Sequence, residues 1–137
     1  MRFEDMDISV WMADLLEKRG GGLFVLLDPD RGSPEKLADM ASRAESAGAD
    51  AILMGSSILL GDSIDAALSA ASEAISIPIF IFPGNAAQLS SRADGVLFLS
   101  LISGRNPRWL IEEHVAAAPI IRKMKLPTLP VGYMLID

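Results

Sequence analysis

The sequence predicts an α/β fold whose sheet strands run parallel. Short apolar runs of four to six residues alternate with segments whose apolar residues recur at helical spacing. This alternation continues along the whole 137-residue chain without a linker or a low-complexity segment. Strands that are separated by helices pair in parallel through right-handed crossovers.

The first half of the chain contains three predicted helices and two predicted strands. The helix over 8–18 has apolar residues at helical spacing, and three glycines end it. Residues 23–27 are a continuous apolar run, typical of a strand buried on both faces. A Ser-Pro-Glu sequence starts the helix over 34–47, because Ser caps, Pro suits the first position and an acid favours the first turn. A short apolar strand over 51–54 and an Ala-rich helix over 64–75 follow.

The second half repeats the pattern with three more strands. Residues 78–82 are an apolar strand closed by Pro-Gly-Asn, and a short helical turn is expected over 86–92. The strand over 96–99 comes next. An Asn-Pro sequence then starts a helix that we expect to extend from 107 to 125. The fifth strand is predicted over 131–136.

Two architectures fit five parallel strands. One is a complete doubly wound domain, and the other is part of a (β/α)8 TIM barrel. A doubly wound domain of this size normally ends in a helix over its last strand, whereas Asp137 directly follows the strand here. The sequence therefore favours a single partial (β/α)8 barrel domain over 1–137, holding the first five β/α units and truncated after strand five.

Composition excludes several classes of function. The chain has 12 Lys+Arg and 18 Asp+Glu, a net charge of −6, which argues against sequence-independent nucleic-acid binding. It has no Cys and one His, which excludes thiolate metal sites and argues against Ser-His-Asp hydrolysis and His-rich zinc sites. Any metal should therefore be a hard, oxygen-ligated ion such as Mg²⁺. No signal peptide or transmembrane stretch is visible, so a cytoplasmic protein is expected.

Polar residues gather where each predicted strand ends, whereas the amino ends of the strands show only Gly, Ala and Pro junctions. Because ligands bind at the carboxyl ends of parallel strands, this asymmetry predicts an active site at that edge. The polar segments are Asp28-Pro29-Asp30, Gly55-Ser56-Ser57, Pro83-Gly84-Asn85, Ser103-Gly104-Arg105-Asn106 and Asp137.

Each candidate also has a purely structural interpretation. Asp28 either serves merely to close a turn or holds a cation. The small residues around Ser57 either form merely a tight βα turn or let a phosphate or metal approach the backbone. Trp109 is interpreted as a packing or interface anchor, and His114 is assigned no role. For Tyr133, core packing and a hydroxyl facing the barrel lumen are equally compatible with the sequence.

Taken together, the motifs resemble the geranylgeranylglyceryl phosphate synthase family, prenyltransferases that make the first ether bond of archaeal membrane lipids. Five segments occur in the family's order and spacing and cover nearly the whole chain, and the fourth is the most specific. They are Leu26–Arg31, Ala47–Ser57, Ile81–Asn85, Phe98–Trp109 and Leu129–Asp137.

The resemblance implies Mg²⁺-dependent transfer of a prenyl group from its diphosphate to the sn-3 hydroxyl of sn-glycerol 1-phosphate. It implies that Asp28 and Ser57 are metal ligands and that Tyr133 contacts glycerol phosphate, with no catalytic residue assigned. It also implies a homo-oligomer. The family's Gly-Gly-Ser turn is Gly55-Ser56-Ser57 here, and the loops after strands six to eight, which hold most of the acceptor site, have no counterpart in this sequence.

Two rival hypotheses belong to other classes. A phosphate-responsive receiver-type module would also place acids after the first strand, but it would need an Asp after strand three and a Lys after strand five. The chain has Pro83-Gly84-Asn85 and Asp137 at those places. An inactive truncated fragment is the other alternative, and no activity is expected of the 137 residues alone. The prenyl chain length is not predicted.

Overall fold

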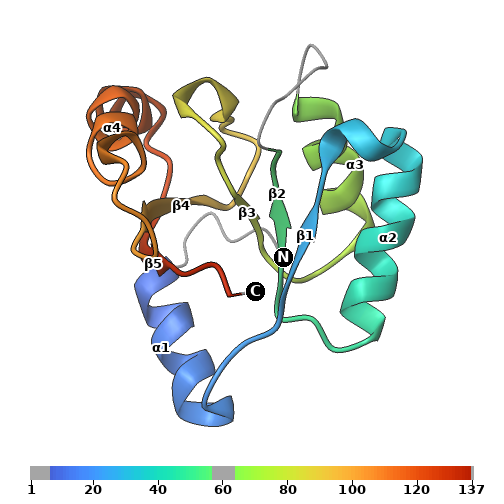
Figure 1. Cartoon of the computed structure of the whole chain (residues 1–137). Helices are drawn as coiled ribbons and strands as arrows, with labels where there is room; N and C mark the ends of the chain where they lie inside the picture. Colours follow the sequence, from blue (N-terminus) through green and yellow to red (C-terminus); the bar gives the residue numbers. More distant parts are fainter. Residues whose placement is uncertain (1–6, 57–63, 137) are drawn as a thin grey trace.

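The fold is a single curved sheet of five parallel strands in sequential order (Figure 1). The computed structural model describes residues 7–56 and 64–136. A doubly wound sheet reverses its strand order at a switch point, whereas the order β1-β2-β3-β4-β5 is that of a barrel wall. The predicted barrel-type architecture is therefore confirmed. The strands are β1 (Phe24–Leu27), β2 (Ala51–Met54), β3 (Ile79–Ile81), β4 (Gly95–Leu101) and β5 (Thr128–Tyr133).

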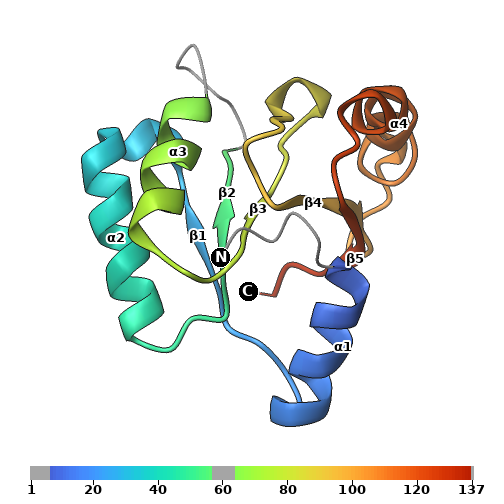
Figure 2. The same ribbon diagram turned by 180° about the vertical axis from the view of Figure 1, so that it is seen from behind.

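The helices surround this wall, with α2 and α3 side by side and α4 at the other end of the sheet (Figure 2). Where a helix would be expected between β3 and β4, the chain has only a three-residue 3-10 turn, η2. The helical segments are α1 (Ile8–Arg19), η1 (Pro29–Arg31), α2 (Pro34–Ser46), α3 (Asp65–Ala74), η2 (Ala86–Gln88), η3 (Pro107–Trp109) and α4 (Glu112–Met124). Within the described residues, none of the helices is both long and apolar enough to cross a membrane.

The outer face of the sheet holds the larger core. Alternate strand residues such as Ile52, Ile81 and Val96 pack under α2, α3 and α4, and Leu37 and Leu68 are their fully buried partners from the helices. Ser33 caps α2 by accepting a hydrogen bond from the backbone N–H of Lys36, as the Ser-Pro-Glu sequence predicts. Each of these helices thus buries one apolar stripe against the outer face of the sheet.

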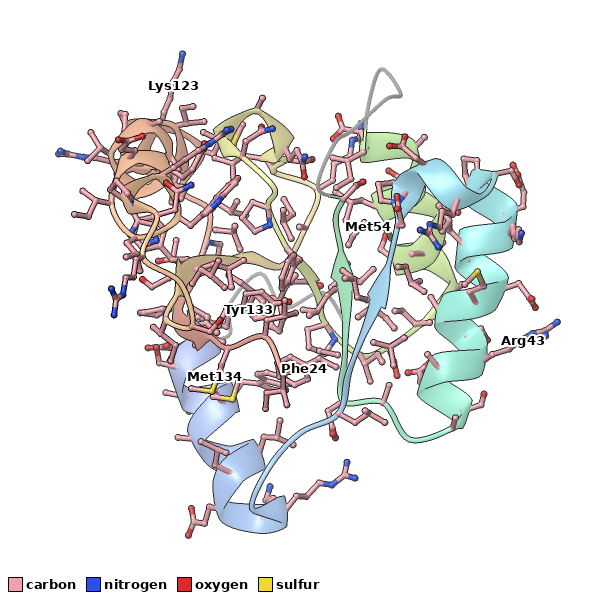
Figure 3. All side chains as sticks on the ribbon, viewed as in Figure 1. Phe24, Arg43, Met54, Lys123, Tyr133 and Met134 are labelled. Atoms are coloured by element: carbon pink, nitrogen blue, oxygen red, sulfur yellow. The ribbon has the colours of Figure 1, made fainter. Side chains whose placement is uncertain are left out.

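The inner face is covered at its amino end by α1. Trp11 of this helix meets Phe80 edge-to-face at 5.5 Å and lies 5.9 Å from Phe24, between ring centroids. Higher on the same face, Leu26 is 50 % exposed. Figure 3 shows Phe24 and Tyr133 in the space that the curved sheet encloses, whereas Arg43 on α2 and Lys123 on α4 point outwards.

Two predicted elements are placed differently in the structure. The fifth strand spans Thr128–Tyr133 rather than 131–136, because its register with β4 pairs Val96 with Thr128 and Leu101 with Tyr133. Pro130 is tolerated within β5 because this strand lies at the edge of the sheet, where a missing N–H faces no neighbour. The helix expected over 107–125 is divided, because Asn106 caps only the short turn η3 and the backbone leaves helical geometry at Ile111.

Strands β3 and β4 separate soon after they pair. They share two register positions, ending at Ile81 opposite Val96, whereas β4 and β5 pair over six positions up to Leu101. The upper half of β4 therefore has no strand on its β3 side. This gap in the wall is the feature that positions the site.

Candidate functional site

Asp28 lies at the carboxyl end of β1, and its side chain closes the turn that follows. Its Oδ1 accepts a hydrogen bond from the backbone N–H of Asp30 at 2.9 Å, and its Oδ2 lies 3.4 Å from Arg31 Nε. The side chain is 29 % exposed. The turn interpretation is therefore correct, and it leaves a carboxylate at the edge where the sequence predicts a cation.

The end of β2 is much tighter than its small residues suggested. A Cβ on Gly55 would lie 1.9 Å from the carbonyl oxygen of Phe82, so only glycine fits between the ends of β2 and β3. The space that a Gly55 side chain would occupy is filled by the backbone of Phe82. Ser57, the second expected metal ligand, lies outside the described residues. Among those that are described, no three His, Cys, Asp or Glu side chains come together as a metal site.

Carboxylates also occur at the amino ends of strands, which corrects the expectation that only Gly, Ala and Pro stand there. Asp50 precedes β2; its Oδ2 accepts from the N–H of Leu23 at 2.8 Å, and its Oδ1 pairs with Arg19. Asp94 precedes β4, and its Oδ2 accepts from the N–H of Ile79 at 2.8 Å. These two acids bind backbone donors of neighbouring segments, so their role is structural.

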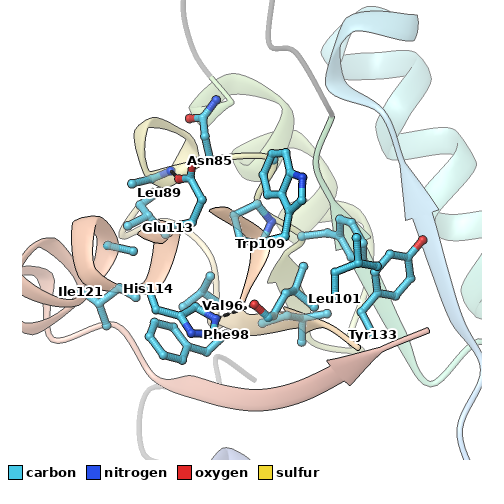
Figure 4. A pocket seen from close by; sticks show the side chains of 17 residues that line it. Asn85, Leu89, Val96, Phe98, Leu101, Trp109, Glu113, His114, Ile121 and Tyr133 are labelled. Atoms are coloured by element: carbon cyan, nitrogen blue, oxygen red, sulfur yellow. Dashed lines mark hydrogen bonds between the residues drawn. The ribbon is translucent and has the colours of Figure 1, made fainter. Parts of the chain in front are cut away.

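A cavity of about 240 Å³ occupies the gap between β3 and β4 (Figure 4). Its walls are the segment after β3, the upper half of β4 and the inward face of α4. The deep end is apolar, lined by Leu89, Val96, Ala117 and Ile121. The sequence does not indicate the position of this pocket, because the position depends on β3 pairing with β4 only as far as Val96 while β4 continues to Leu101.

The rim of the pocket is polar. Glu113 Oε2 accepts from the N–H of Ala86 at 3.1 Å, and its Oε1 accepts from Arg108 Nε at 3.0 Å. The Arg108 guanidinium also lies 4.6 Å from the centre of the Trp109 ring, in a cation–π contact. Trp109 lines the pocket, so the structure gives it a packing role there.

His114 and Tyr133 line the middle of the pocket. The His114 ring stacks on Phe98 with centroids 4.1 Å apart, and its Nε2 is hydrogen-bonded to the carbonyl oxygen of Leu99. Tyr133 packs edge-to-face on Phe82 at 5.3 Å, and in Figure 4 its hydroxyl points away from the pocket. Tyr133 thus combines the two interpretations left open by the sequence, with a packed ring and a hydroxyl outside the pocket.

The sequence missed Glu113 and His114 as pocket residues. The available signal was their place on α4, where His114, Ala117 and Ile121 recur at i, i+3 and i+7 and so share one face. The His114 imidazole, in the first turn of α4 at the end of an apolar helix face, indicates a hydrogen-bond acceptor nearby. Only the tertiary structure identifies that acceptor as the carbonyl oxygen of Leu99.

Comparison with known proteins identifies the family of the chain. The model of the PcrB family matches residues 13–137. The chain belongs to the PcrB family. This PcrB-family chain is 41 % identical over 113 residues to a geranylgeranylglyceryl phosphate synthase of Chitinophaga pinensis, covering 82 % of this chain and 45 % of that protein. It is 35 % identical over 132 residues to the synthase of Methanothermobacter marburgensis, covering 96 % of this chain and 54 % of that one.

Solved structures show the same fold. The geranylgeranylglyceryl phosphate synthase of Thermoplasma acidophilum, in complex with its substrate sn-glycerol-1-phosphate, superposes with a TM-score of 0.82 at 31 % identity. The match covers 92 % of this chain and 52 % of that chain. The wild-type enzyme of Thermoplasma volcanium gives a TM-score of 0.83 at 27 % identity, covering 96 % and 53 %.

The PcrB-family chain spans about half the length of the curated relatives it matches. These relatives are not confined to archaea, because Chitinophaga pinensis is a bacterium.

Proposed function

We propose that the protein transfers a prenyl group from a prenyl diphosphate to the sn-3 hydroxyl of sn-glycerol 1-phosphate. In this reaction the bond between the prenyl C1 and the diphosphate breaks, and C1 forms an ether bond with the glycerol oxygen. The hydroxyl proton is lost and diphosphate leaves. The observation that carries the proposal is the apolar pocket between β3 and β4, which opens at the carboxyl edge of the sheet.

The pocket suits one half of such a substrate. Its deep walls are aliphatic and aromatic, so burial there favours a hydrocarbon chain by roughly 25 cal/mol for each Å² removed from water. Its polar rim lies at the edge where charged groups stay accessible. A molecule with an apolar tail and a charged head therefore fits the direction of the pocket.

The diphosphate end calls for a cation, and the residues at β1 fit Mg²⁺ by their chemistry. Mg²⁺ is bound through one or two carboxylates together with substrate phosphates rather than by a full protein cage. Asp28 supplies a partly exposed carboxylate, and we propose that Asp28 and Ser57 hold the ion. When bound, Mg²⁺ would stabilise negative charge on the departing diphosphate.

Tyr133 is proposed to contact glycerol phosphate. Its ring is fixed against Phe82, and its hydroxyl points away from the pocket, which leaves that oxygen on the acceptor side of the proposed prenyl site. We further propose that the protein acts in the cytoplasm. We also propose that it forms a homo-oligomer, and sedimentation of the purified protein tests this oligomeric state directly.

Asp28→Asn tests the activity and the metal site together. An Asn at this position keeps an oxygen that accepts from Asp30 N–H, so the turn is retained while the negative charge is removed. In the protein as its gene encodes it, we expect prenyl transfer to fall by about 100-fold or more, because several kcal/mol of charge stabilisation are lost. Unchanged transfer at saturating Mg²⁺ would reject Asp28 as a ligand.

A further inference from the structure

The upper half of β4 has backbone groups that no strand satisfies. Val96 N–H donates to Pro127, and Ile102 N–H donates to Tyr133, so the even-numbered residues of β4 face β5. In a parallel strand the N–H and C=O of one residue point to the same side, so Leu99 faces the β3 side. There β3 has already ended at Ile81, and Leu99 therefore presents its carbonyl oxygen to the pocket.

His114 binds this carbonyl oxygen. The acceptor is a carbonyl, so Nε2 must carry the proton that it donates. The ring is also held flat against Phe98, so its plane and its proton are both fixed by β4. The contact is part-buried, so leaving the Leu99 carbonyl oxygen without this partner would cost more than losing a fully exposed hydrogen bond.

Glu113, the neighbouring residue, contacts the β3 side of the gap between β3 and β4. Its carboxylate accepts from Ala86 N–H in η2, the short turn after β3. The first turn of α4 is thus attached to β4 by one side chain and to the segment after β3 by the next. Ala117 and Ile121 follow on the same face of α4 and form the pocket wall opposite Val96.

We propose that His114 is a positioning residue that sets the width of the pocket by fixing α4 at its distance from β4. It lines the pocket itself, and its role is to hold Ala117 and Ile121 where a prenyl chain packs against them. The expected effect on KM rests on the proposed function, whereas the hydrogen bond of His114 rests on the geometry alone.

Two variants separate the hydrogen bond from the ring. His114→Gln keeps an N–H donor at similar reach and loses the stacked ring, whereas His114→Phe keeps the ring on Phe98 and loses the donor. In the protein as its gene encodes it, we expect the Phe variant to raise KM for prenyl diphosphate about fivefold to tenfold, with KM for glycerol phosphate unchanged. We expect the Gln variant to stay within about twofold of the parent. A Phe variant with parental KM values, or one that raises both KM values equally, would overturn the proposal.

A measurement without substrate tests the geometry. The chain has one His, so imidazole ¹⁵N spectra give one signal set for it. We expect a slowly exchanging proton on Nε2, and a rapidly exchanging Nε2 proton, or a ring that carries its proton on Nδ1 alone, would overturn the proposal even in an active enzyme. A protein that shows the protected Nε2–H but transfers no prenyl group would reject the proposed function and leave the hydrogen bond standing.

Discussion

Strand β3 meets β2 along one edge and β4 along the other, and we call these two contacts the β2–β3 joint and the β3–β4 joint. The two joints differ, and the difference explains where the pocket lies. At the β2–β3 joint, Gly55 sits against the Phe82 carbonyl so closely that a single methyl group would clash. At the β3–β4 joint, pairing stops at Ile81 and Val96, and a cavity of about 240 Å³ follows. The edge of β3 that faces β2 is therefore tightly packed, and we call it the sealed joint. The edge that faces β4 borders the pocket, and we call it the open joint.

The pocket therefore comes from the absence of a helix between β3 and β4 more than from special side chains. The crossover between β2 and β3 contains the ten-residue helix α3, whereas that between β3 and β4 contains only the three-residue turn η2. Within the described residues, the crossover between β3 and β4 supplies no helix over the second joint, and α4 with its polar first turn forms the outer wall there. Substitutions at the two joints should have different consequences.

The largest effect is expected at the sealed joint. Gly55→Ala would bring a Cβ to 1.9 Å from Phe82 O, and backbone cannot yield as a side-chain end can. We expect the free energy of unfolding to fall by about 3 kcal/mol or more, measured by urea denaturation.

Gly21→Ala is the matched control, because no heavy atom lies within 4 Å of its added Cβ. It should change stability by less than about 1 kcal/mol. If both variants have the parental stability, the β2–β3 joint is not sealed as described.

An intermediate effect is expected at the open joint. Ala117→Leu places a larger side chain at the deep end of the pocket, where it competes with a long prenyl chain. We expect KM for a geranylgeranyl-length diphosphate to rise about tenfold, and KM for a much shorter prenyl diphosphate to change little.

Ala116→Leu controls for the change in helix composition, since Ala116 is exposed on the same helix. Its KM values should match the parent for both substrates. Equal effects of the Ala117 substitution on long and short chains would place the prenyl tail elsewhere.

The smallest effect is expected in the outer layer beside the sealed joint. Glu45 of α2 accepts hydrogen bonds from the hydroxyl and the backbone N–H of Ser76, and the hydroxyl is the main cause that lowers the pKa of Glu45 below its ordinary 4.5. A lowered folded-state pKa stabilises the fold above the unfolded value, and this stability is lost as pH falls through the folded value.

Ser76→Ala should therefore reduce stability by no more than about 1 kcal/mol near neutral pH, because the contact is exposed. The difference from the parent should shrink below about pH 4.5. Thermal unfolding at several pH values measures it, and a difference that grows on acidification would contradict the assignment.

Much of the fold was accessible from sequence because it is local. The strand over Ala51–Met54 is predicted to the residue, and the Ser33 cap is correctly placed, since apolar runs and caps act over a few residues. The boundaries of β5 were wrong because its register is set by β4, not by its own apolar content.

In the candidate site, too, local features could be predicted from the sequence, whereas contacts between distant segments could not. The carboxyl-end position of Asp28 follows from its place after an apolar run, and the structure confirms that position. The roles of Glu113 and His114 depend on backbone groups of Ala86 and Leu99, which are 27 and 15 residues away. No spacing rule in the sequence connects them.

The most direct test of the account asks where the prenyl chain lies. A prenyl diphosphate with a photoreactive diazirine at the end of its tail should bind the protein as its gene encodes it and label residues nearby on irradiation. We expect mass spectrometry to locate the label on the deep walls of the pocket, at Leu89, Ala117 or Ile121. A label concentrated instead on the inner face around Trp11, Phe24 and Phe80 would contradict the claim that the gap between β3 and β4 holds the substrate.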